Sequence, residues 1–492
     1  MSKFAQYLKE LLEEHGEPIA SVARNAGVER TSIHKALKDE RVLPYGSLRK
    51  LSQYLQLPLV QSRELARRYE ILLQGEDVYG IHTAVRELLL DLSRFEMPSP
   101  DGAPSRPAAG EGGEGSGIRR GALAVRSVVR AVLEREASRP DAQAFVRLPA
   151  DVSLEDVLGS LWCTGAGIVV RRLVDFMPDR RGPEAVEHNL RVLRRLLPLS
   201  LVSRGRMFSY CQFGGDAPAQ GVDPLPYLVV TSERLVRLDE RLTVAQVECD
   251  RDLVDLYRAR FEGTVAECQS LCSYSNDPGV VLDSYMSGTG EHGYCTIMSQ
   301  PCPGRYYTRE LIERYVRPDV PHREELVELS DRRFARLRAL EGNYRTVFTE
   351  AGLRAFARDG VLVDLPRELV SPLDAKTRAG MLRRLKADML SGSVTACVVD
   401  EAYLPIPQHL TFTCDPRFGL HVYATQEFVD GPYACNIHVE EGSIGKAFCS
   451  FVDSLPGSRH VYPEERVISI VDELVCGLEN GSSPHAHEDR GF

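Results

Sequence analysis

The sequence predicts a multi-domain protein with an all-α N-terminal domain, a flexible linker and a large α+β C-terminal region. Apolar residues recur at helical spacing through residues 1–75, which is the pattern of short amphipathic helices. Residues 97–117 are almost wholly Pro, Gly, Ser, Ala and acidic residues, so they cannot contribute to a core. Residues 118–480 mix helix-like and strand-like stretches, which is typical of an α+β arrangement.

Length and composition limit the class of protein. With 492 residues, of which 43% are hydrophobic, the chain can build two or three cores. No stretch approaches the roughly 18 apolar residues that span a membrane, and the N-terminus MSKFAQYLKE lacks the apolar core of a signal peptide. The 12 cysteines are scattered and are expected to be reduced and mostly buried. We therefore expect a soluble, cytoplasmic protein that does not bind membranes.

The N-terminal domain is predicted to contain five short helices. Phe4, Leu8, Leu11 and Leu12 recur at helical spacing and form the apolar stripe of the first helix, which Gly16 closes. Pro18 suits the first turn of the second helix. The other helices are expected at about 18–26, 29–38, 48–57 and 59–73.

The third helix carries the candidate binding residues of this domain. Its apolar positions Ile33, Ala36 and Leu37 face the core, and the remaining positions therefore face solvent or a partner. This outward face is basic and rich in hydrogen-bond donors. Its members are Arg30, Thr31, His34, Lys35 and Lys38.

The run EPIASVARNAGVERTSIHKALKDERVLPYGSLRKLSQYLQL resembles the lambda-repressor-like helix-turn-helix family, also called the xenobiotic-response-element (XRE) family of bacterial transcriptional regulators. The resemblance covers about residues 3–73. It is strong because several individually weak marks occur together. These marks are Ala23, Gly27, Val28, the Thr31-Ser32-Ile33 segment and the Leu48-Leu51-Leu55-Leu57 pattern.

The resemblance implies double-stranded DNA as a partner and a homodimer that binds two half-sites. It implies that Arg30, Thr31 and Lys35 reach base edges. Bidentate contact between an arginine and guanine discriminates by roughly 1–3 kcal/mol. Many family members have Gln at the start of the second helix, where it bonds a phosphate or base; this chain has Pro18-Ile19 there, so the resemblance does not extend to that contact. The resemblance also implies that Ser32, Lys38 and Arg41 lie nearer the phosphates.

Charge is consistent with this interpretation but does not establish it. Residues 1–75 contain 12 Lys and Arg against 9 Asp and Glu, a net charge of +3, whereas the whole chain has −10, which leaves −13 for the rest. A positive module on a negative body suits phosphate binding at one place. The alternative is a helical bundle with an ordinary solvated basic face.

The segments after residue 75 set the expected organisation. We expect a trailing helix within residues 76–96, a flexible linker at 97–117, the α+β region at 118–480 and a disordered tail at 481–492. A loose linker would prevent the α+β region from orienting the helix-turn-helix rigidly. The α+β region would then act mainly through dimerisation or recruitment.

The α+β region contains two similar patterns. Strand-like stretches at 227–230, 235–238 and 244–249 precede a helix at 252–271, and stretches at 410–414, 420–425 and 434–439 precede a helix at 444–455. Two related modules, at about 200–275 and 400–476, are one interpretation; repeated packing of a sheet against a helix is the other. Further helices are expected at 168–176 and 190–197.

No motif identifies a chemical reaction. The segment GTGEHG at 288–293 matches G-x-G-x-x-G, but a strand-like sequence follows it, which favours a glycine-rich hairpin over a dinucleotide site. Cys268 and Cys272 lack a second pair at zinc-binding spacing and are interpreted as structural thiols, with a redox sensor as the alternative. HExxH, Walker and G-x-S-x-G motifs are absent. We therefore expect no enzyme, no cofactor and no metal site.

Two functional hypotheses follow. The favoured one is a sequence-specific transcriptional regulator whose C-terminal region senses an effector or mediates oligomerisation. The second is an enzyme or small-molecule-binding protein that carries an autoregulatory helix-turn-helix. A deep pocket with converging polar side chains would distinguish them. The candidate ligand residues are His292, Tyr294, Arg305 and Tyr306.

Overall fold

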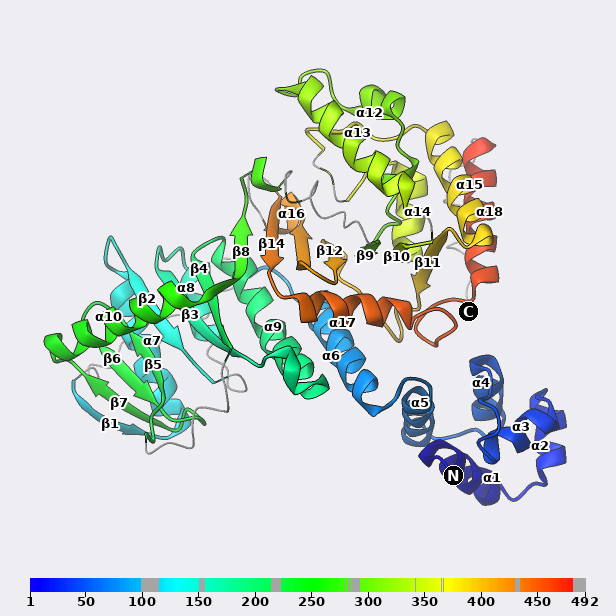
Figure 1. Cartoon of the computed structure of the whole chain (residues 1–492), viewed down its shortest axis with the longest axis horizontal. Coiled ribbons are helices and arrows are strands. Elements are labelled where there is room, and N and C mark those ends of the chain that lie inside the picture. Colours follow the sequence, from blue (N-terminus) through cyan, green and yellow to red (C-terminus); the bar gives the residue numbers. More distant parts are fainter. Residues whose placement is uncertain are drawn as a thin grey trace.

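The computed structural model describes residues 1–98, 115–149, 155–213, 223–277, 279–281, 284, 293–340, 342–363, 365, 367–429 and 434–480. A small helical domain at the N-terminus stands at one end of the molecule, and a long mixed sheet with helices on its faces forms the rest (Figure 1). Most of the predicted linker and the whole predicted tail, at 99–114 and 481–492, lie outside the described residues. The described helices include none with the length and apolar character needed to cross a membrane.

The N-terminal domain has the five expected helices. Ser2 caps the first of them by accepting a hydrogen bond from the Ala5 backbone N–H, and Gly27 ends the second with a φ of 64°, which favours glycine. Phe4, Leu8 and Ile33 are at most 1% exposed and lie in one core. The helices are α1 (Lys3–His15), α2 (Ile19–Ala26), α3 (Arg30–Leu37), α4 (Tyr45–Tyr54) and α5 (Leu59–Gln74).

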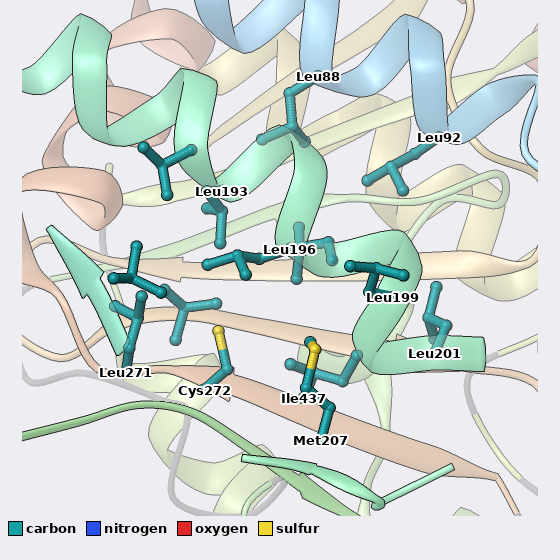
Figure 2. Packing of buried hydrophobic residues seen from close by; sticks show 14 of the residues in the cluster. Leu88, Leu92, Leu193, Leu196, Leu199, Leu201, Met207, Leu271, Cys272 and Ile437 are labelled. Carbon is teal, nitrogen blue, oxygen red and sulfur yellow. The ribbon is translucent and has the colours of Figure 1, made fainter. Parts of the chain in front are cut away.

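The next helix, α6 (Glu76–Ser93), belongs to the large body and not to a mobile connection. Leu88 and Leu92 on α6 pack against Leu193 and Leu196 of α9 (Pro183–Ser203), and this helix pair covers one face of the sheet (Figure 2). The expectation of a loosely attached helix-turn-helix is therefore corrected. The apolar stripe of α6 is buried in the body core before the chain reaches the predicted linker, so the linker does not separate the two parts.

A 14-stranded sheet runs through the body, and all its described strands form one continuous order. The order is β1-β7-β6-β5-β2-β3-β4-β8-β14-β13-β12-β9-β10-β11. The first half consists of β1 (Gly117–Arg120), β2 (Gln143–Arg147), β3 (Val169–Phe176), β4 (Met207–Phe213), β5 (Tyr227–Val230), β6 (Leu235–Leu238), β7 (Val244–Glu248) and β8 (Gln269–Ser275), with helices α7 (Ala122–Ala137), α8 (Glu155–Cys163), α9 and α10 (Arg251–Glu267).

Most helices of the second half share a core that is separate from the core of α6 and α9, whereas the helix at 442–453 packs in the same core as α6 and α9 and contacts both. Its strands are β9 (Tyr294–Ile297), β10 (Tyr344–Thr349), β11 (Val394–Val399), β12 (Leu410–Asp415), β13 (Gly419–Ala424) and β14 (Cys435–Val439). Its helices are α12 (Arg309–Tyr315), α13 (Arg323–Ala339), α14 (Glu350–Asp359), α15 (Ala375–Ser391), α16 (Gln426–Val429), α17 (Gly442–Asp453) and α18 (Glu464–Glu479).

The two halves repeat one strand order. In the first half, β4-β3-β2 are parallel and continue into the antiparallel strands β5-β6-β7; in the second half, β11-β10-β9 are parallel and continue into β12-β13-β14. Strand β8 joins the halves by pairing with β4 and β14. The modules expected at about 200–275 and 400–476 fall on the antiparallel part of each half. Their common origin stays a prediction.

One expected helix is a strand. Residues 168–176 were expected to be helical, but β3 occupies Val169–Phe176 and pairs with β2 and β4. Val170, Leu173 and Val174 are spaced as on a helix, yet they are buried because a central parallel strand is covered on both faces. Apolar spacing alone cannot separate a helix from such a strand.

Candidate functional site

The predicted recognition helix α3 presents its basic face outward. The turn before it is closed by a hydrogen bond from Val28 N–H to the Ala23 carbonyl, at 2.9 Å, and Ile33 anchors the helix at 0% exposure. Each predicted DNA-binding residue lies on α3 or just after it. Arg30, Thr31, Lys35, Lys38 and Arg41 are exposed, and Ser32 and His34 are half-buried.

A carboxylate that the sequence reasoning missed stands at the start of α3. Glu29 accepts hydrogen bonds from the Thr31 hydroxyl at 2.6 Å and the Ser32 hydroxyl at 2.9 Å. These two hydrogen bonds lower the pKa of Glu29, so the group is charged at neutral pH. The Thr31 and Ser32 hydroxyls are therefore engaged, and Glu29 adds an acceptor that suits the N4 amino group of cytosine and repels phosphate.

Arg30 and His34 lie one helical turn apart on the same face. Arg30 Nε donates to His34 Nε2 at 3.3 Å. This contact positions the arginine side chain along α3. The two side chains thus lie together on the outward face of α3. From the sequence, only their spacing of four residues indicated that they would be neighbours.

A buried ion cluster connects the N-terminal domain to the body. Glu70 of α5 is 7% exposed and lies among Arg86 of α6 and two residues of the loop before α18, Arg459 and His460. Glu70 carboxylate oxygens lie 2.9 Å from Arg459 Nε, 3.1 Å from Arg86 Nη1 and 3.3 Å from His460 Nε2. Contacts between residues so far apart in sequence hold α5 on the body.

The charge state of the cluster follows from its geometry. Burial raises the pKa of Glu70, but the contact with His460 and the charges of Arg459 and Arg86 outweigh it and bring the pKa to about 2. Burial lowers the pKa of His460. Glu70 is therefore ionised and faces two arginines at neutral pH.

His82 of α6 makes a second bridge to the body. Its ring nitrogens lie 2.5 Å from Gln74 Oε1 and 3.0 Å from the Ser450 hydroxyl on α17. Burial lowers the pKa of His82 to about 4, so the ring is neutral at pH 7. The N-terminal domain is thus fixed by both charged and neutral contacts around α6.

A cavity of about 710 Å³ lies at the ends of the strands in the second half of the sheet. The residues around it follow or precede strand ends: Ser299 and Gln300 come after β9, Gly352 lies in the first turn of α14 after β10, and Thr425 follows β13. Other lining residues include Val281, Ala351, Ala355, Val361, Leu362, Val363, Leu365, Leu369, Gln408, His409, Thr411, Tyr423 and Ala424.

The strand order explains why a cavity forms here. The chain proceeds from β9 outward to β10 and β11 and then returns to β12 on the other side of β9. The connection that leaves β9 therefore runs to the β10 side, whereas the connection that enters β12 lies on the other side of β9. This divergence opens a crevice at the carboxyl end of the parallel strands. Ligands commonly bind at such a switch point, so this is the candidate ligand site of the body.

A row of polar side chains crosses the same sheet next to the cavity. His438, His421, Thr413, Thr296 and Thr346 are register partners on β14, β13, β12, β9 and β10. The two histidine rings stack with centroids 4.0 Å apart. Within the described residues, the buried hydroxyls of Thr296 and Thr413 have no hydrogen-bond partner, which is costly for a purely structural core.

Hydrogen bonds and burial set the state of His421 in this row. Its Nδ1 lies 2.9 Å from the Ser284 hydroxyl, and Asn436 Nδ2 donates to the same hydroxyl at 2.9 Å. Burial, followed by the neighbouring His438, lowers the pKa of His421 to about 4. Polar residues alternate with apolar ones in LTFTCD, GLHVYA and CNIHV, and this period-2 signal could have identified the row from sequence.

Of the four ligand residues predicted from sequence, the three that the structure describes do not line the cavity. Tyr294 is 2% exposed and packs against Tyr344 in the core beneath α13, and Tyr306 is 5% exposed in the same core. Arg305 lies 3.3 Å from Asp388 and stacks over the Tyr344 ring. These residues therefore form a packed structural cluster. His292 lies outside the described residues.

The other sequence motifs occupy varied positions. The glycine-rich segment at 288–293 lies outside the described residues except for Gly293. Cys272 is buried on β8 and Cys302 is buried after β9, whereas Cys268 is partly exposed. In the described part of the chain, no group of three or more His, Cys, Asp or Glu side chains is placed to hold a metal ion.

Comparison with known proteins finds only distant similarity. No protein-family model and no curated protein matches the chain. Among solved structures, the archaeal chromatin protein TrmBL2, described as showing a novel mode of DNA binding, is 16% identical at a TM-score of 0.24, and the match covers 54% of this chain and 100% of TrmBL2.

Two further solved structures are similar over a larger share of this chain. Polyphosphate kinase from Porphyromonas gingivalis is 10% identical at a TM-score of 0.22, with 89% of this chain and 65% of that chain covered. Phosphatidylserine synthase from Haemophilus influenzae Rd KW20 is 8% identical at a TM-score of 0.22, with 81% and 98% covered. TM-scores this low assign no reaction to this chain.

The comparisons nevertheless correct one expectation. The lack of catalytic motifs predicted that the chain is not an enzyme, but two of these structural neighbours are enzymes, and this contradicts the prediction. We withdraw it without assigning a reaction. The third neighbour is described as a DNA-binding protein, and no family model matches the XRE family.

Proposed function

We propose that this protein is a sequence-specific DNA-binding transcriptional regulator of the XRE type that binds its operator as a homodimer. The exposed basic face of α3 carries this proposal: Arg30 and Lys35 project from a helix that Ile33 anchors. A helix placed in this way after a tight turn suits the major groove of DNA. One such module contacts about half a site, so two copies of the chain would occupy a repeat.

The body has a defined part in the proposed function. Glu70, Arg86 and Arg459 join α5 to the body, so the body determines where α3 stands. Two modules held in this way present their recognition helices at a fixed distance. We expect the spacing between half-sites to be restricted as a result.

The decisive experiment compares base contacts with phosphate contacts. The operator is first selected from a random duplex library with the full chain. Arg30→Ala is expected to weaken operator binding by roughly 1–3 kcal/mol and to leave random DNA little affected. Lys38→Ala is expected to weaken both and to reduce the slope of log affinity against log salt by about 0.9 for a single phosphate contact.

A matched control defines the non-specific effect of losing a charge. Lys9 on α1 is exposed and pairs with Glu13 at 3.6 Å, outside the helix-turn-helix. Lys9→Ala is expected to leave operator affinity unchanged. Equal losses on operator and random DNA for Arg30→Ala would refute the base-reading role, and selection of no preferred sequence would refute the proposed function.

A further inference from the structure

The inner wall of the cavity in the second half of the body is built without charge. Gln300, Thr411 and Tyr423 are at most 7% exposed and supply neutral polar groups, and the surrounding wall is aliphatic. A buried charge in a ligand would therefore meet no opposite charge inside, at a high desolvation cost. The inner wall favours an uncharged ligand.

The charged residues that line the cavity are exposed and lie at its rim; they are Arg358, Arg367, Glu368 and Glu427. Arg367 and Glu427 are exposed and stand 3.7 Å apart, and Arg358 pairs with Asp359. These pairs keep the guanidinium groups outside the apolar interior. The rim can remain solvated while the interior is filled by a ligand.

The cavity is supported by a rigid frame. Gln300 donates from Nε2 to the Val361 carbonyl at 3.0 Å and accepts from the Val363 backbone N–H at 3.2 Å, so both ends of its amide hold the wall. Gly352 packs so closely on Ser299 that a Cβ would overlap the Ser299 carbonyl oxygen. A pre-formed site loses little conformational entropy when it binds.

One end of the cavity adjoins the polar row. Thr411 and Tyr423 line the cavity, and they lie two residues from Thr413 and His421 on the same faces of β12 and β13. The Tyr423 hydroxyl lies 3.5 Å from that of Ser284. Neutral hydrogen-bonding groups are thus concentrated at the end of the cavity near Thr411 and Tyr423.

We propose that this cavity binds an uncharged, largely apolar small molecule that carries a hydrogen-bonding group at one end, and that this molecule is the effector of the protein. The role as effector rests on the proposed DNA-binding function, whereas the binding itself does not. The apolar part lies against α14 and Val361, Leu362 and Val363, and the polar end lies toward Thr411 and Tyr423.

The test uses the full chain and N-phenyl-1-naphthylamine, a neutral apolar probe whose fluorescence rises in a dry environment. We expect saturable binding to the wild type. Ala355→Trp places a large side chain in the cavity from α14 and is expected to weaken probe binding by roughly tenfold or more. Ala387→Trp, on the exposed face of α15 away from the cavity, is the matched control and is expected to bind like the wild type.

The outcomes are separable. If Ala355→Trp does not fold by circular dichroism, Ala351→Trp gives the same test from an exposed lining position in the first turn of α14. Unchanged probe binding in the folded cavity variant, or no saturable binding to the wild type, overturns the proposal. Operator affinity is measured with and without probe in parallel. Probe binding without any operator binding leaves the ligand site intact and removes only its effector role.

Discussion

Replacement of Glu70 by Gln is expected to detach the N-terminal domain from the body. Glu70 is buried among Arg86, Arg459 and His460, and its pKa is about 2 instead of the ordinary 4.5. Since each pKa unit corresponds to 1.36 kcal/mol, the carboxylate stabilises this contact by about 3 kcal/mol over a neutral group. Removing one member of a buried ion pair typically costs a similar amount.

The sign of the pH dependence follows from the same shift. The folded-state pKa of Glu70 lies below its unfolded value, so its stabilisation is fully present above about pH 4.5. It is lost as the pH falls from 4.5 toward 2. At neutral pH the wild-type contact therefore has its full strength.

Hydrogen exchange measures the detachment locally. The amides of the C-terminal turns of α5 and the N-terminal turns of α6 are expected to exchange roughly a hundredfold faster in Glu70→Gln, because about 3 kcal/mol of opening free energy is lost. Exchange is the suitable assay because a chain of several parts has no single unfolding transition.

A second glutamate on α5 provides the control. Glu64 pairs with Arg67 and Arg68, but its side chain is 31% exposed, so Glu64→Gln should cost no more than about 1 kcal/mol. In Glu64→Gln, the same amides of α5 and α6 should exchange at most about fivefold faster than in the wild type. Equal protection of α5 and α6 in the Glu70 and Glu64 variants would refute the view that the buried cluster holds the domain.

Three further outcomes are expected. Leu88→Ala on α6, at a position with 0% exposure, should lower the opening free energy of the α6 amides in hydrogen exchange by roughly 2–5 kcal/mol, far more than Leu90→Ala at a half-buried position. Similar effects of the two variants would show that α6 lies outside the body core. Gly352→Ala should cost roughly 3 kcal/mol or more, because backbone at Ser299 blocks the new methyl group; an unchanged melting temperature would contradict this packing. The pKa of His421, about 4, lies below its unfolded value, so the contribution of His421 to the free energy of unfolding should be constant above about pH 6.5 and fall by roughly 3 kcal/mol between pH 6.5 and 4. NMR titration of this histidine with a midpoint near 6.5 would disprove that shift.

Local patterns were sufficient for the N-terminal helices but not for every element of the body. Phe4, Leu8 and Ile33 repeat at helical spacing and become the core of the first domain. Val170 and Leu173 have similar spacing, yet they belong to a strand, since a central parallel strand is apolar on both faces. The difference depends on neighbouring strands that lie far away in the sequence.

The candidate sites show the same limit. Arg30 and Lys35 could be identified because a recognition helix is local, and its outward face follows from the residues that point inward. The residue type of Tyr294 suggests a place in a pocket, but its ring is buried against Tyr344. The cavity combines Gln300, Thr411 and other residues from separate strand ends, and no stretch of sequence contains that combination.

The sequence by itself determined the five N-terminal helices, the exposed basic face of α3 and the antiparallel strands of each half of the body, because each depends on periodicity within a short segment. Only the tertiary structure decided that α6 is part of the body, that Glu70 fastens α5 to residues 459–460, and that a cavity opens beside β9. These features depend on contacts between residues hundreds of positions apart, and burial makes such contacts strong without leaving a local pattern.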